Sequence, residues 1–253
     1  MARVYLTGGL RVEGPAGVVA DDDLPGLQGR LTLAILATER RPVARDELAE
    51  LVWDGELPPH WSAALSAILS KLRALLTDIG LDGRDVVTSS GGSCAIRWPS
   101  GTWVDLEDAY RRLDRAEGAL RRGQHETAAR DATVASAVFR RRLLTGLANG
   151  WVDERQRAHS DALYRTLVAL ADAWTALGNF ALAGTIAASA IRHDRFRETA
   201  YRQLVAAELA RGDHGGARRA YEQLVRMLGD ELGVSPSLAT TTLIEQIGTT
   251  TRD

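Results

Sequence analysis

The sequence predicts a mainly α-helical protein, with a small α+β region at the N-terminus and an all-helical region after it. Two observations predict this fold class. In the first 100 residues, short strand-like runs enclose three amphipathic helical segments. After residue 102, the apolar positions follow a helical period, and one helix–turn–helix pattern recurs. We therefore expect two domains, residues 1–99 and 102–253, joined at Pro99–Thr102.

The first domain is predicted to begin with a small sheet. Three short runs rich in β-branched or other apolar residues lie around Gly8-Gly9 and end before an aspartate-rich loop. These strands are expected at Val4–Leu6, Leu10–Val12 and Val18–Ala20.

Three helices and a hairpin complete this domain. The helices are expected at Leu27–Thr38, Asp46–Trp53 and Trp61–Leu76. The third helix repeats its leucines at the spacing of one face, so its inner face should consist of Leu65, Ile68 or Leu69, Leu72 and Leu76. Strand-like residues 86–88 and 95–98 flank a Gly-Gly pair. Strands, three helices and a hairpin, in this order, indicate a winged helix–turn–helix with an additional N-terminal sheet.

The second domain is predicted to consist of repeated helical hairpins. Gly178 and Gly212 stand 34 positions apart, and each is followed five residues later by an alanine, Ala183 or Ala217. Helix–turn–helix repeats of this period are typical of tetratricopeptide-like domains. Each glycine can adopt the positive φ that ends one helix, and each alanine allows the paired helices to approach closely. Such repeats bind partners on a concave face.

A third copy is expected at Gly123, with Ala128 five residues later. It lies 55 residues before Gly178, so we expect an insertion or an extra helix around Leu143–Glu154. Asp105 is expected to cap the helix that runs to Arg122. Further helices are expected at about residues 124–142, 151–177, 180–193, 196–211, 214–231 and 237–247.

Composition limits the classes of protein. The 253 residues are 45% hydrophobic and 25% charged, as in ordinary globular proteins. There is no apolar run long enough to span a membrane and no signal-peptide core, and Cys94 is the single cysteine. We therefore expect a cytoplasmic protein without membrane association. The first 100 residues carry 10 basic and 13 acidic side chains, a net charge of −3, which does not favour strong DNA binding unless the charges are segregated.

The sequence offers little for catalysis. Its five histidines show no paired metal-ligand spacing, and it contains no Cys-x-x-Cys. The phosphate-binding G-x-x-x-x-G-K-[ST] and the nucleophile motif G-x-S-x-G are also absent. We therefore expect no enzyme activity, no catalytic residues, no metal site and no cofactor.

Several segments resemble one known family. In the first domain they are residues 41–48 (RPVARDEL) and 69–76 (LSKLRALL). In the second they are 151–155 (WVDER), 196–213 (FRETAYRQLVAAELARGD) and 217–236 (ARRAYEQLVRMLGDELGVSP). These segments resemble the Streptomyces antibiotic regulatory proteins (SARPs) and their actinobacterial relatives. That family joins a response-regulator-type winged helix to a bacterial transcriptional activator domain.

The resemblance implies a sequence-specific transcription regulator that binds double-stranded DNA as a homodimer. It places the third helix in the major groove and the wing against the DNA backbone or minor groove. It also implies that the helical domain dimerises and contacts RNA polymerase. The DNA-binding residues expected on this basis lie at the start of the second helix, on the third helix and in the wing: Arg45, Ser62, Ser66, Ser70, Lys71, Arg73, Ser89 and Ser90.

Two interpretations of these residues stay open. Arginine and lysine can contact phosphates, and serine can contact a phosphate or a base edge. However, Ser62, Ala64, Ser66 and Ile68 stand where the family usually carries arginine, threonine, glutamine and histidine. The alternative is therefore an interaction or sensor protein, in which the winged helix no longer reads DNA and the helical groove binds a protein or small ligand. Cys94 is expected to be a small buried or wing residue.

Overall fold

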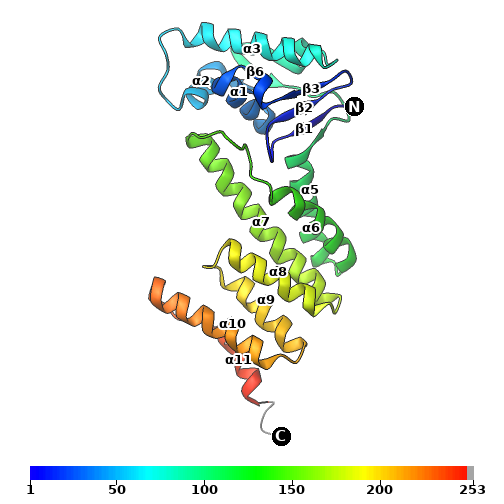
Figure 1. Cartoon of the computed structure of the whole chain (residues 1–253), viewed down its shortest axis with the longest axis vertical. Coiled ribbons are helices and arrows are strands. Elements are labelled where there is room, and N and C mark those ends of the chain that lie inside the picture. Colours follow the sequence, from blue (N-terminus) through cyan, green and yellow to red (C-terminus); the bar gives the residue numbers. More distant parts are fainter. Residues whose placement is uncertain (250–253) are drawn as a thin grey trace. The chain divides into compact units, whose positions relative to one another are not determined.

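A computed structural model describes residues 1–249, with side chains up to residue 243. Figure 1 shows a mixed α and β region at the N-terminal end and successive helices after it, which confirms the predicted fold class. The residues form two units, one of Met1–Ala109 with Val138–Ser160 and one of Tyr110–Ala137 with Asp161 onward. The predicted division at residues 99–102 stays a prediction. No helix in the described part of the chain is long and apolar enough to cross a membrane.

The first unit contains two small sheets. One has the order β3-β2-β1-β7, from Val18–Ala20, Arg11–Glu13, Arg3–Tyr5 and Trp103–Val104. Its strands are antiparallel except that β7 runs parallel to β1, and Val4, Val12 and Val19 share one register row. The other sheet has the order β4-β6-β5, from Val43–Ala44, Ser93–Ile96 and Val87–Ser90. The sequence did not predict β4 and β7, because strands of two residues carry no recognisable alternation.

Four helices accompany these sheets. They are α1 (Gly26–Glu39), α2 (Arg45–Trp53), α3 (Trp61–Asp78) and the short α4 (Gly83–Val86). Leu65, Leu69, Leu72 and Leu76 form the buried face of α3, which confirms the predicted face and selects Leu69 over Ile68. Asp82 caps α4 by accepting hydrogen bonds from the amides of Arg84 and Asp85.

Asp105 has a different role from the helix cap that we expected. It is the first residue of α5 (Asp105–Arg121) and is completely buried. Its carboxylate accepts hydrogen bonds from the amides of Leu6 (2.9 Å) and Thr7 (3.1 Å) and from the Thr7 hydroxyl (2.7 Å). Within its own helix it accepts only the adjacent amide, that of Leu106, at 2.7 Å. Asp105 therefore holds the chain that follows β1 against the start of α5.

The expected interruption between repeats is present, and it belongs to the first unit. Helix α6 ends at Phe139 and α7 begins at Gly150. The intervening chain pairs with the N-terminal strand region, since the Gly8 amide donates to the Arg142 carbonyl and the Leu144 amide donates to the Leu6 carbonyl, both at 2.9 Å. The Trp151 indole N–H donates to Glu39 Oε1 at 3.0 Å. Trp151, near the start of α7, is buried within this unit.

The repeated hairpins follow the predicted pattern. Three helix–turn–helix pairs are α5 with α6 (His125–Phe139), α7 (Gly150–Ala176) with α8 (Phe180–His193), and α9 (Glu198–Ala210) with α10 (His214–Met227). The glycines between them, Gly123, Gly178 and Gly212, have φ values of 70°, 75° and 77°. The alanines five residues after each, Ala128, Ala183 and Ala217, are buried. The π-helical turn Leu228–Leu232 and α11 (Leu238–Thr249) complete the chain that the structure describes.

Candidate nucleic-acid interface

The wing and the second helix are joined by backbone hydrogen bonds. In β4, Val43 and Ala44 pair with Cys94 and Ser93 of β6. Strands β5 and β6 are joined by Gly91 and Gly92, whose φ values of 59° and 77° suit a tight two-residue hairpin turn. Because α2 begins directly after β4, the sheet fixes the position of Arg45, whose amide donates to the Gly92 carbonyl at 2.9 Å.

The Arg45 guanidinium connects α2, α3 and the wing. Its Nη2 donates to the Ser66 hydroxyl at 2.9 Å and to the Ser62 carbonyl at 3.1 Å. Its Nη1 donates to the Ser89 hydroxyl of β5 at 3.4 Å. The Ser66 hydroxyl donates in turn to the Ser62 carbonyl at 2.9 Å. We call these four residues the Arg45 cluster.

The Arg45 cluster can offer donors to an anion. A guanidinium has five N–H donors, and hydrogen bonds to neutral oxygens leave its charge uncompensated. Three neutral serine groups hold this cation at the junction of the third helix and the wing. Both elements touch DNA in winged-helix complexes.

The other predicted site residues do not join the cluster. Arg73 is partly buried, and its Nε donates to the Val87 carbonyl at 2.8 Å, so it ties α3 to β5. Lys71 is exposed, but it lies five positions after Ser66, which places it about 140° away around the helix. Ser70 is exposed one turn after Ser66, and Ser90 is exposed at the end of β5.

Arg41, near the start of α2, is compensated by carboxylates. Its guanidinium donates to both carboxylate oxygens of Glu47, with Nη1 3.1 Å from Oε2, and its Nε lies 3.5 Å from Glu39. The hydrogen bonds between Arg41 and Glu47 lower the pKa of Glu47 and raise the pKa of Arg41. Arg41 therefore adds little net positive charge beside Arg45.

The outward face of α3 carries small side chains. Ala63, Ala67 and Ala74 are all exposed there. Alanine offers a base only an apolar contact, as with a thymine methyl group. In the wing, Cys94 is buried, as expected, and its Sγ lies 3.7 Å from the Ser89 hydroxyl.

The sequence did not predict how Arg45 is bonded. Its partners lie 17, 21 and 44 residues along the chain, and no local pattern joins such separations. The position of Lys71 could have been found, because the angle between two side chains of one helix follows from their spacing. Among the described residues, no group of three or more histidines, cysteines, aspartates and glutamates is arranged to hold a metal ion.

Known proteins resemble the chain over most of its length. The transcriptional regulatory proteins EmbR of Mycobacterium tuberculosis and Mycobacterium bovis are each 28% identical to it over 229 residues, which are 86% of this chain and 56% of each relative. The chain thus spans little more than half the length of these relatives. The structure of M. tuberculosis EmbR in complex with a low-affinity phosphopeptide matches with a TM-score of 0.89 at 24% identity. The match covers 98% of this chain and 65% of that one, and it shows a shared fold.

The family is shown by a domain model. The model of the bacterial transcriptional activator domain matches residues 104–248, which is more than half of the chain. This range contains the three repeat hairpins and most of α11. The chain therefore belongs to the bacterial transcriptional activator domain family, and its predicted SARP-like character is confirmed.

Proposed function

We propose that this protein is a SARP-type transcription regulator that binds double-stranded promoter DNA through α3 and the wing. The Arg45 cluster carries this proposal, because it holds an uncompensated cation where α2, α3 and β5 meet. The EmbR relatives are named transcriptional regulatory proteins, which supports the same class of function.

In the proposed complex, α3 enters the major groove and Arg45 contacts a phosphate at its edge. Ser62, Ser66 and Ser89 orient the guanidinium, so it loses little side-chain freedom on binding. Lys71 contacts a phosphate on the other flank of the helix, and Ser70 and Ser90 contribute hydroxyl groups. Phosphate contacts set the register of the protein on DNA, while base contacts set sequence preference. Arg73 is assigned a structural role because of its hydrogen bond to Val87.

The helical repeats are proposed to mediate dimerisation and contact with RNA polymerase, as in the family. A groove with a volume of about 360 Å³ supports a role in partner binding. It is lined from α5, α7 and the start of α9 by charged residues around an apolar floor, among them Glu117, Arg121, Arg165 and Arg197. We further propose that residues 1–99 and 102–253 act as the two functional domains, that the protein is cytoplasmic and that it catalyses no reaction.

The test is an unbiased selection of bound fragments from a GC-rich genomic library, followed by titration of the enriched fragments. We expect an enriched direct repeat. The Arg45→Ala variant should bind it about tenfold or more weakly, with the slope of log affinity against log salt reduced by about one. Arg45→Lys keeps the charge but not the fork of donors, so it should recover only part of the affinity.

Arg130→Ala is the matched control, because Arg130 is an exposed arginine of α6 in the second unit. It should bind as the unmodified protein does. Thermal melting of each variant separates a loss of DNA contact from a loss of folding. Equal binding by Arg45→Ala and Arg130→Ala would contradict the proposed role of the Arg45 cluster.

The second candidate function is an interaction or sensor protein whose winged helix does not read DNA. The exposed alanines Ala63, Ala67 and Ala74 favour it, because they leave few base-reading groups on α3. If a folded, monodisperse protein enriched no DNA sequence, this function would replace the first. The next experiment would then seek partners of the helical groove.

A further inference from the structure

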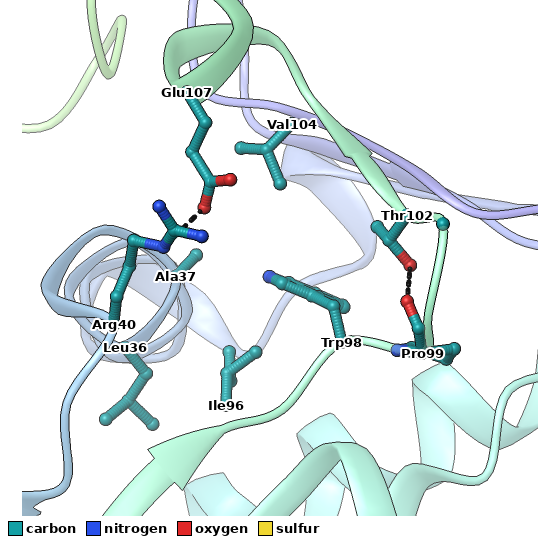
Figure 2. A pocket seen from close by; sticks show the side chains of 10 residues that line it. Leu36, Ala37, Arg40, Ile96, Trp98, Pro99, Thr102, Val104 and Glu107 are labelled. Carbon is teal, nitrogen blue, oxygen red and sulfur yellow. Dashed lines mark hydrogen bonds and ion pairs between the residues drawn. The ribbon is translucent and has the colours of Figure 1, made fainter. Parts of the chain in front are cut away.

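A cavity in the first unit lies apart from the Arg45 cluster. Its volume is about 310 Å³, it is partly open to solvent, and it is lined by the end of α1, the end of β6, the loop after β6, β7 and the start of α5. Figure 2 shows the side chains that surround it. Six of the ten lining residues are apolar, but the polar groups make up more of the surface that the cavity exposes; the apolar residues are Leu36, Ala37, Ile96, Trp98, Pro99 and Val104. A volume of this size is typical of small-molecule sites.

The indole nitrogen of Trp98 is the distinctive polar group of this cavity. The atom is buried and has no hydrogen-bond partner among the residues that the structure describes. In Figure 2 it points toward the side of the cavity where Ala37, Arg40 and Glu107 lie. Buried N–H groups nearly always have an acceptor in folded proteins. The Trp98 N–H therefore lacks an acceptor, which a bound molecule would supply after a small shift of the side chains that cover it.

The charged groups of the cavity balance each other. Arg40 Nε lies 2.9 Å from Glu107 Oε1, so one positive and one negative side chain form an ion pair at the cavity. Arg40 is the residue at which α1 ends, with a φ of 53° that directs the chain away from the helix. Because the pair carries no net charge, the cavity favours a neutral molecule over an ion.

We infer that this cavity binds a small neutral organic molecule whose carbonyl oxygen accepts the Trp98 indole N–H. Its apolar body would pack against Ile96, Pro99 and the Trp98 ring, the apolar lining residues that are not fully buried. Ile96 ends β6, which pairs with β4, and β4 leads directly into Arg45. A bound molecule would thus touch the sheet that positions the Arg45 cluster and could act as an effector. This regulatory consequence rests on the proposed function, whereas binding itself does not.

Binding can be tested without DNA by two-dimensional NMR of protein labelled with ¹⁵N in its tryptophan indoles. The six tryptophans should give one indole signal each, and the Trp98→Phe variant identifies that of Trp98. The probes are acetophenone, which carries a carbonyl oxygen, and ethylbenzene, which has a similar shape and no acceptor. We expect acetophenone to shift the Trp98 signal saturably and to bind about tenfold more tightly than ethylbenzene, since only its oxygen satisfies the N–H.

Two variants sharpen this test. Trp98→Phe keeps the apolar walls but lacks the donor, so the affinity for acetophenone, read from ligand-observed NMR, should fall to that for ethylbenzene. Ala37→Leu places a larger side chain in the cavity and should abolish the binding of both probes. The pair of probes tests the unmodified protein, so the inference does not depend on the folding of either variant. An unshifted Trp98 signal, or equal affinity for the two probes, would overturn it. Neither result depends on whether the protein binds DNA.

Discussion

The two units of this protein are stabilised in different ways. In the first, polar side chains join residues far apart in the sequence, as where Asp105 binds the Leu6 amide 99 positions away and Glu39 binds the Trp151 indole 112 positions away. In the second, the hairpins close within a few residues around Gly178 and Gly212. A repeat can therefore be recognised from local sequence, whereas the winged-helix unit depends on how distant segments meet.

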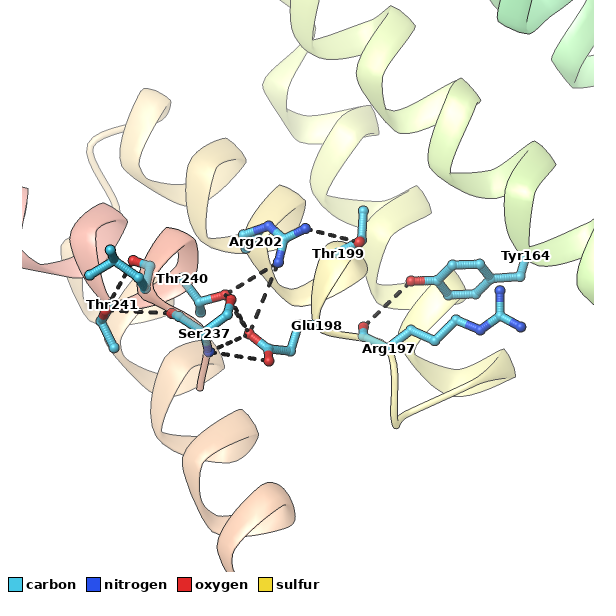
Figure 3. A network of polar contacts seen from close by, with 9 residues as sticks. Tyr164, Arg197, Glu198, Thr199, Arg202, Ser237, Thr240 and Thr241 are labelled. Carbon is cyan, nitrogen blue, oxygen red and sulfur yellow. Dashed lines mark hydrogen bonds and ion pairs between the residues drawn. The ribbon is translucent and has the colours of Figure 1, made fainter. Parts of the chain in front are cut away.

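The end of the second unit is an exception to this rule. Glu198, the first residue of α9, receives hydrogen bonds from the residues that begin α11 (Figure 3). Its carboxylate accepts from the Ser237 amide (3.0 Å), the Ser237 hydroxyl (2.8 Å) and the Thr240 hydroxyl (2.7 Å). Burial acts to raise the pKa of Glu198, but the hydrogen bonds from Thr240 and Ser237 outweigh it and lower the pKa. A distant carboxylate therefore helps to hold the start of α11, in addition to the packing of Leu243 against Val205, Ala217 and Ala220.

The largest effect is expected at Asp105. Asp105→Ala leaves the amides of Leu6 and Thr7 and the Thr7 hydroxyl without their buried acceptor. The free energy of unfolding of the first unit should fall by about 3 to 5 kcal/mol. Urea denaturation followed by tryptophan fluorescence measures this loss.

Asp114→Ala is the control for this substitution, because Asp114 is an exposed aspartate of the same helix. It should change the stability by less than about 0.5 kcal/mol. If Asp105→Ala also lowered the free energy of unfolding by less than about 1 kcal/mol, the stability of the first unit would not depend on this long-range contact.

A smaller effect is expected at a repeat turn. Gly212→Ala places a β-carbon where nothing lies within 4 Å, so its cost comes from the positive φ of 77°. The stability of the second unit should fall by about 1 to 2 kcal/mol. Gly118→Ala, in the interior of α5, should act in the opposite direction and stabilise by up to about 1 kcal/mol. Denaturation of both variants, followed by circular dichroism, measures the two changes in the free energy of unfolding. Changes of the same sign would contradict the explanation that the positive φ of Gly212 causes the loss.

The smallest effect is expected at Glu198. Glu198→Gln keeps one acceptor oxygen and removes the charge. The free energy of opening of α11 should therefore fall by about 1 kcal/mol, and its amides should exchange roughly fivefold faster. Hydrogen exchange of residues 237–243 at pH 7 measures this change. Glu222→Gln, on the exposed side of α10, is the control and should leave this exchange unaltered.

The lowered pKa of Glu198 also predicts a pH dependence. A carboxylate whose pKa is lower in the folded state stabilises that state above its unfolded pKa of about 4.3, and this contribution is lost as the pH falls through the folded pKa. Protection of residues 237–243, corrected for intrinsic exchange, should therefore decrease below about pH 4 in the unmodified protein. The decrease should be smaller in Glu198→Gln. Equal pH profiles would show that α11 is held by other contacts.

Much of the fold could be predicted because the features that carry it are periodic. The leucines of α3 lie on the face that their spacing indicates, and the repeat hairpins begin and end close to the expected residues. The strands β4 and β7 could not be predicted, because each has two residues and exists only through pairing with a distant strand. Asp105 looked like a helix cap because aspartates often precede helices, yet its partners include residues near the N-terminus.

The candidate site was predictable only in part. Arg45, Ser62, Ser66 and Ser89 were expected from a family resemblance, and their mutual hydrogen bonds were not. Arg73 was expected at DNA, but the Val87 carbonyl binds its Nε. No sequence pattern predicted the cavity beside Trp98, because α1, β6 and the start of α5 each contribute part of its wall.

The sequence by itself determined the helical repeats, because helix periodicity, the positive φ of a glycine and the small size of an alanine act within a few residues. It also determined the buried face of α3, for the same reason. Only the tertiary structure decided which arginine contacts the wing, which carboxylate binds the chain after β1 and where an indole N–H lacks an acceptor. Those outcomes depend on the path that brings together residues between 17 and 99 positions apart, and no local pattern encodes that path.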